Sequence, residues 1–314
     1  MDESKHIEKV VKLLPRIILD TDIGTNADDA VALALAVKSP EIRLEGVTTV
    51  YGQVQARAVI ADKIMRLCGV EGIPVYPGIE QPLLRNRPMF RAGLERKGWS
   101  PDDEEKEWDK HAVDFIVETV MRNPGEITLV TIGPQTNIAA ALIREPRLSE
   151  RVKEIVVMGG VTRLASNGLH LSALEFNIQC DPEAASVVFA SGAPIVMVGL
   201  DVTRQAVFSR EEKDKMAACG TPLALELTDM MQSFMDYMDR DFSYMCDPLA
   251  VAAVIDRSFI RTRRMNVSVH YDHREDSGQT IAELSDNGNV EVALEVDTER
   301  YFRMLHSRLF TACS

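Results

Sequence analysis

The sequence has no apolar run of the roughly 18 residues that a membrane-spanning helix needs. Its first 15 residues are charged throughout and contain no apolar stretch of the kind found in secretory signal peptides. The five cysteines are odd in number and widely spaced, and no Cys-x-x-Cys pair occurs, which argues against a disulfide framework or a zinc knuckle. We therefore expect no membrane association and a reducing compartment, the cytoplasm.

Basic charge is also scarce, since 35 Lys and Arg residues face 48 Asp and Glu residues and give a net charge of −13. An acidic surface repels phosphate backbones, so we expect no nucleic-acid partner. The one tight basic cluster, Arg261, Arg263 and Arg264, is predicted to lie in a solvated turn. The sequence has no Gly-x-Gly-x-x-Gly, P-loop or Gly-x-Ser-x-Gly motif, which argues against a dinucleotide site, a nucleotide P-loop and a serine nucleophile elbow.

Short β-branched segments alternate with helical patterns along most of the 314 residues, of which 46% are hydrophobic. The predicted strands are 16–20, 43–50, 127–132, 154–160 and 194–201, and the predicted helices are 27–39, 111–122, 137–143 and an Ala-rich segment that ends at Cys68. Strands that are apolar on both faces and separated by helices indicate a parallel sheet covered on both sides. We therefore predict an α/β fold of Rossmann-like type, formed as a single domain over 1–314.

The last 50 residues have a different pattern. Segments 265–271 and 290–296 alternate apolar and polar residues, and Asp286-Asn287-Gly288 lies between them. This pattern predicts an antiparallel hairpin at the edge of the sheet. Asp297 is expected to cap a final helix that ends near Phe310.

The strongest chemical signal is the segment LDTDIGTNADDA at 19–30, which has four carboxylates, Asp20, Asp22, Asp28 and Asp29, at a strand–loop–helix junction. Ligands bind at the carboxyl ends of strands in such sheets. An N-cap at Asn26 with acids in the first helical turn accounts for Asp28 and Asp29, but not for the two acids of the strand. Two carboxylates about 4 Å apart repel by about 4 kcal/mol at an effective dielectric constant near 20. We therefore predict a site for a hard cation, calcium or magnesium.

Five segments together resemble the inosine–uridine-type nucleoside hydrolases, a family of metal-dependent N-ribohydrolases. The segments are DTDIGTNADDA at 20–30, VTTVYGQ at 47–53, VTIGPQTNIA at 130–139, EFNIQCDPEAA at 175–185 and CDPLAVA at 246–252. The resemblance covers nearly the whole chain. It implies the nucleoside hydrolase fold, a nucleoside substrate and a homodimer or homotetramer.

The resemblance also implies a calcium site, formed by Asp22, Asp29, Asp247 and the backbone carbonyl of Ile132. Asp22 would act as the general base for a water held by the ion. The reaction would hydrolyse the N-glycosidic bond through an oxocarbenium-like transition state, whose positive charge a group of carboxylates favours. Asp20 would support this cluster from behind.

The remaining site residues follow from the same resemblance. Asp28, Asn177 and Glu175 would form hydrogen bonds with the ribose hydroxyls, and Met158 would line the sugar pocket. Gln53 stands where an Asn commonly contacts the ribose. Five residues separate Asp22 and Asp28, where the common family form has three, so the loop can shift Asp28.

Two positions where the family commonly has a histidine that helps the base to leave are different in this chain. Cys246 precedes Asp247, and Lys97 stands at the other position. Cys246 is either a weak donor to the leaving base or a buried apolar residue. In the helix predicted over 223–240, Phe234, Tyr237 and Met238 are candidate contacts for the base, with ordinary helix packing as the alternative. Trp99 and Trp108 lie in an acidic loop that is either a lid or plain surface.

Other functions stay open at this point. Asp-x-Asp at a first strand end also occurs in phosphotransferases of the haloacid dehalogenase type, but Gly24 stands where that family has Thr or Val. A nucleoside- or sugar-binding relative that has lost catalysis would fit the missing histidines. A hydrolase of a modified nucleoside is the remaining alternative.

Overall fold

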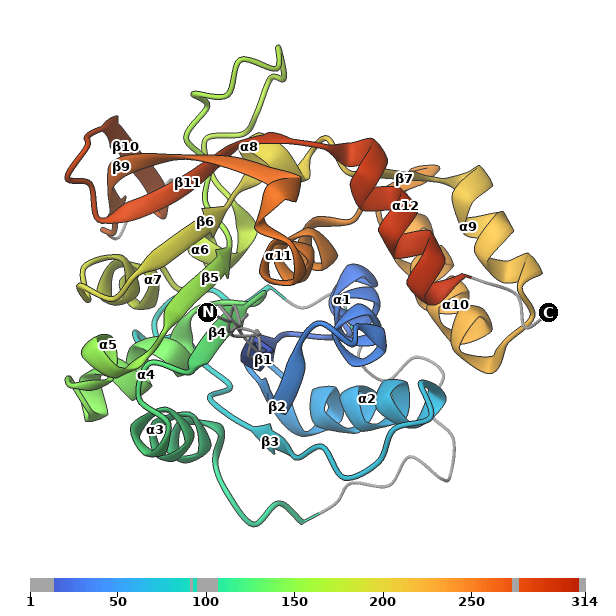
Figure 1. Ribbon diagram of the computed structural model, residues 1–314, viewed down its shortest axis with the longest axis horizontal. Helices are drawn as coiled ribbons and strands as arrows, with labels where there is room; N and C mark the ends of the chain where they lie inside the picture. Colours follow the sequence, from blue (N-terminus) through green and yellow to red (C-terminus); the bar gives the residue numbers. More distant parts are fainter. Residues whose placement is uncertain (1–13, 91–92, 95–106, 273–276, 311–314) are drawn as a thin grey trace, which may run out of the picture.

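The computed structural model describes residues 14–90, 93–94, 107–272 and 277–310. It contains a nine-stranded sheet in the order β10-β9-β11-β6-β5-β4-β1-β2-β3, with helices on both faces (Figure 1). The strands of this sheet are β1 (Arg16–Thr21), β2 (Arg43–Thr49), β3 (Val75–Pro77), β4 (Ile127–Thr131), β5 (Glu154–Met158), β6 (Ile195–Val198), β9 (Ile260–His270), β10 (Gln279–Leu284) and β11 (Val290–Val296). A second sheet pairs β7 (Val207–Ser209) with β8 (Phe242–Tyr244) in antiparallel fashion.

The helices form two layers. They are α1 (Asp28–Lys38), α2 (Val54–Leu67), α3 (Ala112–Arg122), α4 (Thr136–Arg144), α5 (Leu148–Arg151), α6 (Phe176–Cys180), α7 (Pro182–Phe189), α8 (Leu200–Thr203), α9 (Arg210–Ala218), α10 (Pro222–Tyr237), α11 (Cys246–Ile255), α12 (Thr298–Leu309) and the 3-10 helix η1 (Arg257–Phe259). Helices α1, α2, α10, α11 and α12 pack on one side, and α3, α4 and α7 on the other (Figure 1).

Strand β1 shows why the central strands are apolar along their whole length. Ile17 and Leu19 pack into the core beneath α1 and α11, whereas Ile18 packs into the core beneath α3 and α4. Strands β1 to β6 within this sheet pair in parallel, so the predicted α/β fold with a parallel sheet covered on both faces is confirmed.

The C-terminal region differs from its prediction in one element. Strands β9 and β11 pair in antiparallel fashion as expected, but β10 lies between them in sequence and forms the edge of the sheet beside β9. β11 joins the main sheet by pairing in parallel with β6. β10 was not predicted, because an edge strand whose residues are half-exposed shows only a weak alternation of apolar and polar residues. The final helix is confirmed, with the Asp297 side chain accepting a hydrogen bond from the Arg300 backbone N–H.

One alternative interpretation and one local prediction do not hold. Ala27, not Asn26, is the N-cap of α1, and it makes no side-chain cap hydrogen bond. Arg261, Arg263 and Arg264 are solvated, but they lie on β9 and not in a turn. A strand with one solvated face displays every second side chain to water, and a short window of sequence there resembles a turn.

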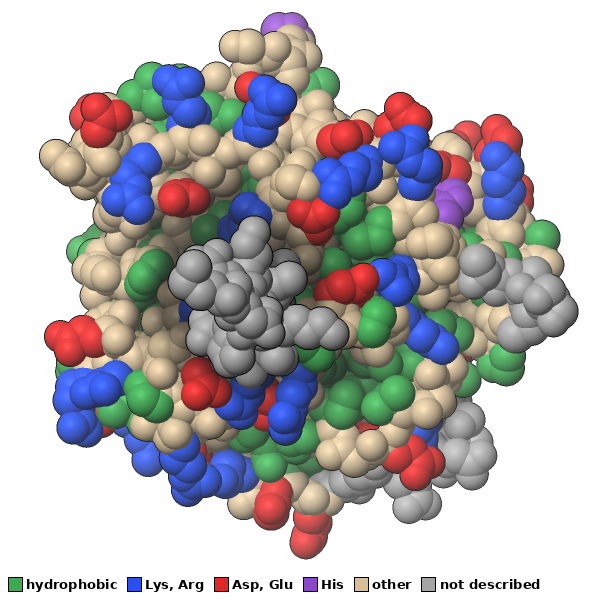
Figure 2. All heavy atoms as spheres, in the orientation of Figure 1, with side chains coloured by type: hydrophobic (Ala, Val, Ile, Leu, Met, Phe, Trp, Pro, Cys, Tyr) green, Lys and Arg blue, Asp and Glu red, His purple; other side chains and the backbone are tan. Residues whose placement is uncertain are grey.

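The surface shown in Figure 2 has acidic and basic side chains interspersed among its described residues. Within the same part of the chain, no helix is long and apolar enough to cross a lipid bilayer. Its four described cysteines, Cys68, Cys180, Cys219 and Cys246, are free thiols.

Candidate active site

A cavity of about 930 Å³ opens at the carboxyl ends of the central strands. We call its acidic part, formed by Asp22, Asp28, Asp29 and Asp247, the floor. The outer end is the part that α10, β8 and the end of α8 supply, and its residues are Arg204, Phe234, Tyr237, Met238, Arg240 and Tyr244. The volume is in the range of ordinary small-molecule sites.

The floor forms where the N-termini of α1 and α11 meet. Side-chain oxygens of Asp28, Asp29 and Asp247 lie within 4.8 Å of one another, and all three residues are buried. Oδ2 of Asp28 accepts hydrogen bonds from the backbone N–H groups of Cys246 at 3.0 Å and Asp247 at 3.3 Å. Thr21 donates its hydroxyl to Oδ1 of Asp29 at 2.5 Å. Residues more than 200 positions apart in sequence are thus joined into one acidic group.

Burial makes it unfavourable for all four carboxyl groups of the floor to be ionised at once. It raises the pKa of Asp28 to about 7, and it raises the pKa values of Asp29 and Asp247 well above their usual range, with the neighbouring carboxylates adding to the effect. Oδ1 of Asp28 is buried without a hydrogen-bond partner. A divalent cation held by Asp22, Asp29 and Asp247 would supply the opposite charge, and a hydroxyl of a ligand would supply the partner that Oδ1 of Asp28 lacks. The residues of the floor therefore fit a hard, oxygen-seeking ion.

Asp20 lies two residues before Asp22, and its expected support of the floor stays a prediction. Its Oδ1 accepts hydrogen bonds from the Thr48 hydroxyl at 2.6 Å and the Asn137 amide at 2.8 Å, which joins β1 to β2 and α4. Complete burial raises the pKa of Asp20 to about 7. Asp20 is not among the residues that line the cavity.

Arg57 fixes the loop that follows β1, a role that was not predicted from the sequence. Its side chain is 1% exposed and donates to the backbone carbonyls of Asp22, Ile23 and Tyr51 and to the hydroxyl of Thr25. One guanidinium therefore joins the loop with Asp22 to the turn after β2. In a sequence, an arginine near the start of an Ala-rich helix is typical of a solvated residue. The role of Arg57 was therefore not predicted.

The side wall of the cavity comes from the ends of β4 and β5 and the start of α6. Glu175 is the N-cap of α6, and its carboxylate accepts hydrogen bonds from the backbone N–H groups of Gly160, Asn177 and Ile178. The Asn177 amide donates to the carbonyls of Ile132 at 2.9 Å and Met158 at 3.1 Å. The expected sugar-binding residues Met158, Glu175 and Asn177 all line the cavity, as does Ile132.

The outer end is aromatic and cationic. The ring centroid of Phe90 lies 5.2 Å from that of Phe176 and 6.4 Å from that of Tyr237. Phe234, Tyr237 and Met238 line the cavity as expected. The cavity is also lined by residues that were not predicted from the sequence: Tyr51, Phe90, Arg204, Arg240 and Tyr244. Nothing in their local sequence marked these residues, because distant segments bring them to the cavity.

Cys246 lines the cavity beside Asp247 of the floor, and Arg204 of the outer end acts on its thiol. Burial, followed by the charge of Asp28, raises the pKa of its thiol to about 12, while Arg204 acts in the opposite direction. The thiol is therefore neutral at physiological pH and can only be a weak hydrogen-bond donor.

Several other predictions have mixed outcomes. Gln53 is the N-cap of α2 and is not among the residues that line the cavity. Lys97 and Trp99 lie outside the described residues, and Trp108 is half-buried against the core that contains α1. Helix α10 ends at Tyr237, short of the predicted residue 240, because Asp239 adopts a left-handed backbone conformation with φ of 49°.

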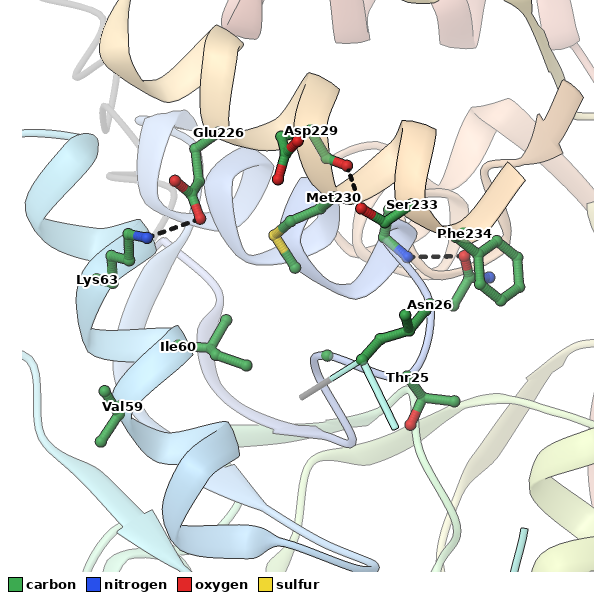
Figure 3. Close-up of a pocket in the computed structure, with 13 residues that line it drawn as sticks. Thr25, Asn26, Val59, Ile60, Lys63, Glu226, Asp229, Met230, Ser233 and Phe234 are labelled. Carbon is green, nitrogen blue, oxygen red and sulfur yellow. Dashed lines mark hydrogen bonds and ion pairs between the residues drawn. The ribbon is translucent and has the colours of Figure 1, made fainter. Parts of the chain in front are cut away.

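A much smaller cavity of about 30 Å³ lies between α2 and α10, beside the loop 24–27 (Figure 3). Lys63 of α2 and Glu226 of α10 form an ion pair of 2.9 Å at this cavity. Thr25, Asn26 and Phe234 line both this cavity and the large one. Its volume is close to that of one or two water-sized probes, so it is too small for an organic substrate.

Comparisons with known proteins cover nearly the whole chain. Residues 17–303 match the family model described as inosine-uridine preferring nucleoside hydrolase. The chain is 32% identical over 304 residues to the pyrimidine-specific ribonucleoside hydrolase RihB of Escherichia coli O1:K1, and the match covers 92% of this chain and 95% of the relative.

Two solved structures are similar over nearly their whole length. The plant nucleoside hydrolase PpNRh1 superposes with a TM-score of 0.84 at 30% identity, covering 95% of this chain and 100% of the other. The purine-preferring ribonucleoside hydrolase from Gardnerella vaginalis has a TM-score of 0.82 at 31% identity, with coverage of 94% and 98%. The chain therefore belongs to the inosine-uridine preferring nucleoside hydrolases, a family of N-ribohydrolases.

Proposed function

We propose that this protein hydrolyses the N-glycosidic bond of ribonucleosides to ribose and the free base, with calcium as its ion. The observation that supports this most directly is the meeting of Asp28, Asp29 and Asp247 within 4.8 Å at the bottom of a large cavity. The reaction builds positive charge on the anomeric carbon, and buried carboxylates stabilise such charge more strongly than water does.

The ion would be held by Asp22, Asp29, Asp247 and the carbonyl of Ile132, all of which line the cavity. When bound, calcium lowers the pKa of an attached water and neutralises the floor. Asp22 accepts the proton that the attacking water loses. The ordered backbone around Asp22, held by Arg57, supports this assignment, because a general base must lie at a fixed distance from its proton donor.

The ribose would lie against the side wall. Glu175 and Asn177 already form hydrogen bonds with backbone groups, and these bonds fix their side chains before substrate arrives. Asp28 is fixed in the same way by the N-terminus of α11. We assign these three residues to the ribose hydroxyls, with Met158 beneath the sugar. A contact between Gln53 and the ribose stays a prediction, because the Gln53 side chain would have to turn toward the cavity.

The base class is left broad in this proposal. The relatives include one named for pyrimidine specificity and one named for purine preference, at 32% and 31% identity. These nearly equal similarities favour neither base, so the proposal covers purine and pyrimidine ribonucleosides. We further propose that the chain works as one unit and assembles as a homodimer or homotetramer, which light scattering tests.

Release of reducing sugar from a panel of purine, pyrimidine and modified ribonucleosides tests the proposal. We expect release that a calcium chelator abolishes and that added calcium restores, and magnesium serves as the comparison ion. If calorimetry shows nucleoside binding but no member of the panel is cleaved, the protein is a binding relative and the catalytic proposal is wrong.

A further inference from the structure

Two arginines at the outer end of the cavity are not used by the proposed chemistry. Arg204 is the C-cap of α8, and Arg240 follows the left-handed residue that ends α10. Both line the cavity that contains the acidic floor. Their guanidinium carbons lie 4.3 Å and 5.5 Å from the ring centroid of Tyr244, so one aromatic ring contacts both cations.

Neither guanidinium has a carboxylate partner within ion-pair distance among the residues that the structure describes. Arg240 contacts the rings of Phe234 and Phe242 as well, with its guanidinium carbon 5.3 Å and 5.2 Å from their centroids. Its Nε is buried without a hydrogen-bond partner. Burial and the charge of Arg204 lower the pKa of Arg240. Two partly buried cations that contact one ring, with no carboxylate of the described residues within ion-pair distance and only the more distant charge of Asp28 acting on Arg240, are unfavourable. This arrangement favours an electron-rich ligand beside them.

The cleavage of the N-glycosidic bond itself produces an electron-rich group that fits this position. When the N-glycosidic bond breaks, its electron pair stays on the base nitrogen, and the base leaves with negative charge. The acids of the floor cannot stabilise this charge. The neutral Cys246 thiol is only a weak donor. Arginine keeps its proton under all ordinary conditions, and it offers several N–H donors to an anion.

We propose that Arg204 and Arg240 are catalytic residues that bind the departing base as an anion, through charge and hydrogen bonds without proton transfer. This inference rests on the proposed function. The bond between the anomeric carbon and the base nitrogen breaks with both electrons going to nitrogen, and water adds to the anomeric carbon. Asp22 takes the proton of that water, and the released base anion takes a proton from solvent. Nothing besides water is consumed.

The test compares two leaving groups in the calcium-loaded enzyme. One substrate is the nucleoside that the panel shows to be cleaved fastest, and the other is p-nitrophenyl β-D-ribofuranoside, whose nitrophenolate is a stable anion without assistance. For Arg240→Met and Arg204→Met we expect kcat for the nucleoside to fall by about 10- to 100-fold, as for loss of one preorganised donor to a developing anion. For the nitrophenyl riboside we expect kcat to change by less than about threefold. Arg240→Lys, which keeps the charge, should recover part of the loss.

Arg261→Met is the matched control, because Arg261 is an exposed arginine on β9, outside the cavity. It should leave both rates unchanged. Equal losses on the two substrates in the Arg240 and Arg204 variants would show a purely structural role and overturn the inference alone. A loss of wild-type kcat toward alkaline pH with the nucleoside only would reveal a titrating acid and would also overturn it. Failure of the wild-type enzyme to cleave either substrate would overturn the proposed function, and the inference with it.

Discussion

At the floor of the cavity Asp28, Asp29 and Asp247 are no more than 5% exposed, whereas at the outer end Tyr237 and Met238 are 45% and 44% exposed. The floor lies at the ends of β1, α1 and α11, elements that pack in the centre of the molecule (Figure 1). The outer end depends on the last turn of α10 and the three-residue strand β8. The reacting part of the site is thus built into the core, and the part that faces the base is built on peripheral elements.

We expect the two parts of the site to respond differently to substitution. A change at the floor alters buried charges that share hydrogen bonds across the sheet, so we expect activity and stability to change together. A change at an exposed side chain of the outer end alters contacts with the substrate, so we expect effects on substrate binding or turnover with little effect on folding. The following experiments test this contrast, beginning with the largest expected effect.

Asp22→Asn should lower kcat at least about 10³-fold, because the amide cannot accept the proton of the attacking water. Ribose release under saturating calcium measures this effect. Asp214→Asn on the exposed face of α9 is the control and should keep full activity. A fully active Asp22→Asn enzyme would show that another group is the general base.

Arg57→Met should destabilise the fold by about 3–5 kcal/mol, because the carbonyls of Asp22, Ile23 and Tyr51 would stay buried without their charged donor. Calcium affinity should fall as well, since the loop with Asp22 is no longer fixed. Urea unfolding and calcium titration measure the two effects. Arg66→Met, on the exposed face of the same helix, should change neither. A loss of stability without any loss of calcium affinity would separate Arg57 from the ion site.

Chelator-treated protein should lose stability as the pH rises. Burial raises the pKa of Asp28 from 3.8 to about 7, so the folded state holds this proton more tightly than the unfolded state does. The stabilisation is complete below about pH 4 and is lost as the pH increases through about 7. Calcium at about 100 times its dissociation constant should add about 2.7 kcal/mol. Thermal melts at several pH values, with and without calcium, measure both effects. A metal-free protein that is most stable at alkaline pH would contradict the assigned charge cluster.

Tyr237→Ala should have the smallest effect. Loss of its ring contact with Phe90 and with a bound base should raise KM about 3- to 10-fold, in line with about 0.5–1.5 kcal/mol for an aromatic pair. kcat and the urea midpoint should stay the same, which steady-state kinetics and unfolding curves measure. Tyr271→Ala, another exposed tyrosine, is the control. A large loss of stability in Tyr237→Ala would remove the contrast between the floor and the outer end.

Local pattern was sufficient for much of the fold. The apolar segments that became β1, β4 and β5 are buried on both faces, and this condition is visible in sequence as an uninterrupted β-branched run. β10 was missed because an edge strand has one exposed face and little apolar content. Asp22, Asp28 and Asp29 of the floor were predicted from the motif at 20–30, whereas Asp247 was expected only from the family resemblance.

The α/β class and the acids at 20–30 could be predicted from local pattern, and the family from five short segments, because each of these signals lies within a few contiguous residues. The contacts between distant groups at the site come from the tertiary structure. It placed Asp247 beside Asp28 and Asp29, joined Arg57 to the carbonyl of Asp22, and brought Arg204 and Arg240 to the ring of Tyr244. Contacts of this kind depend on the packing of whole helices and on chain reversals such as that at Asp239, and no local spacing encodes them.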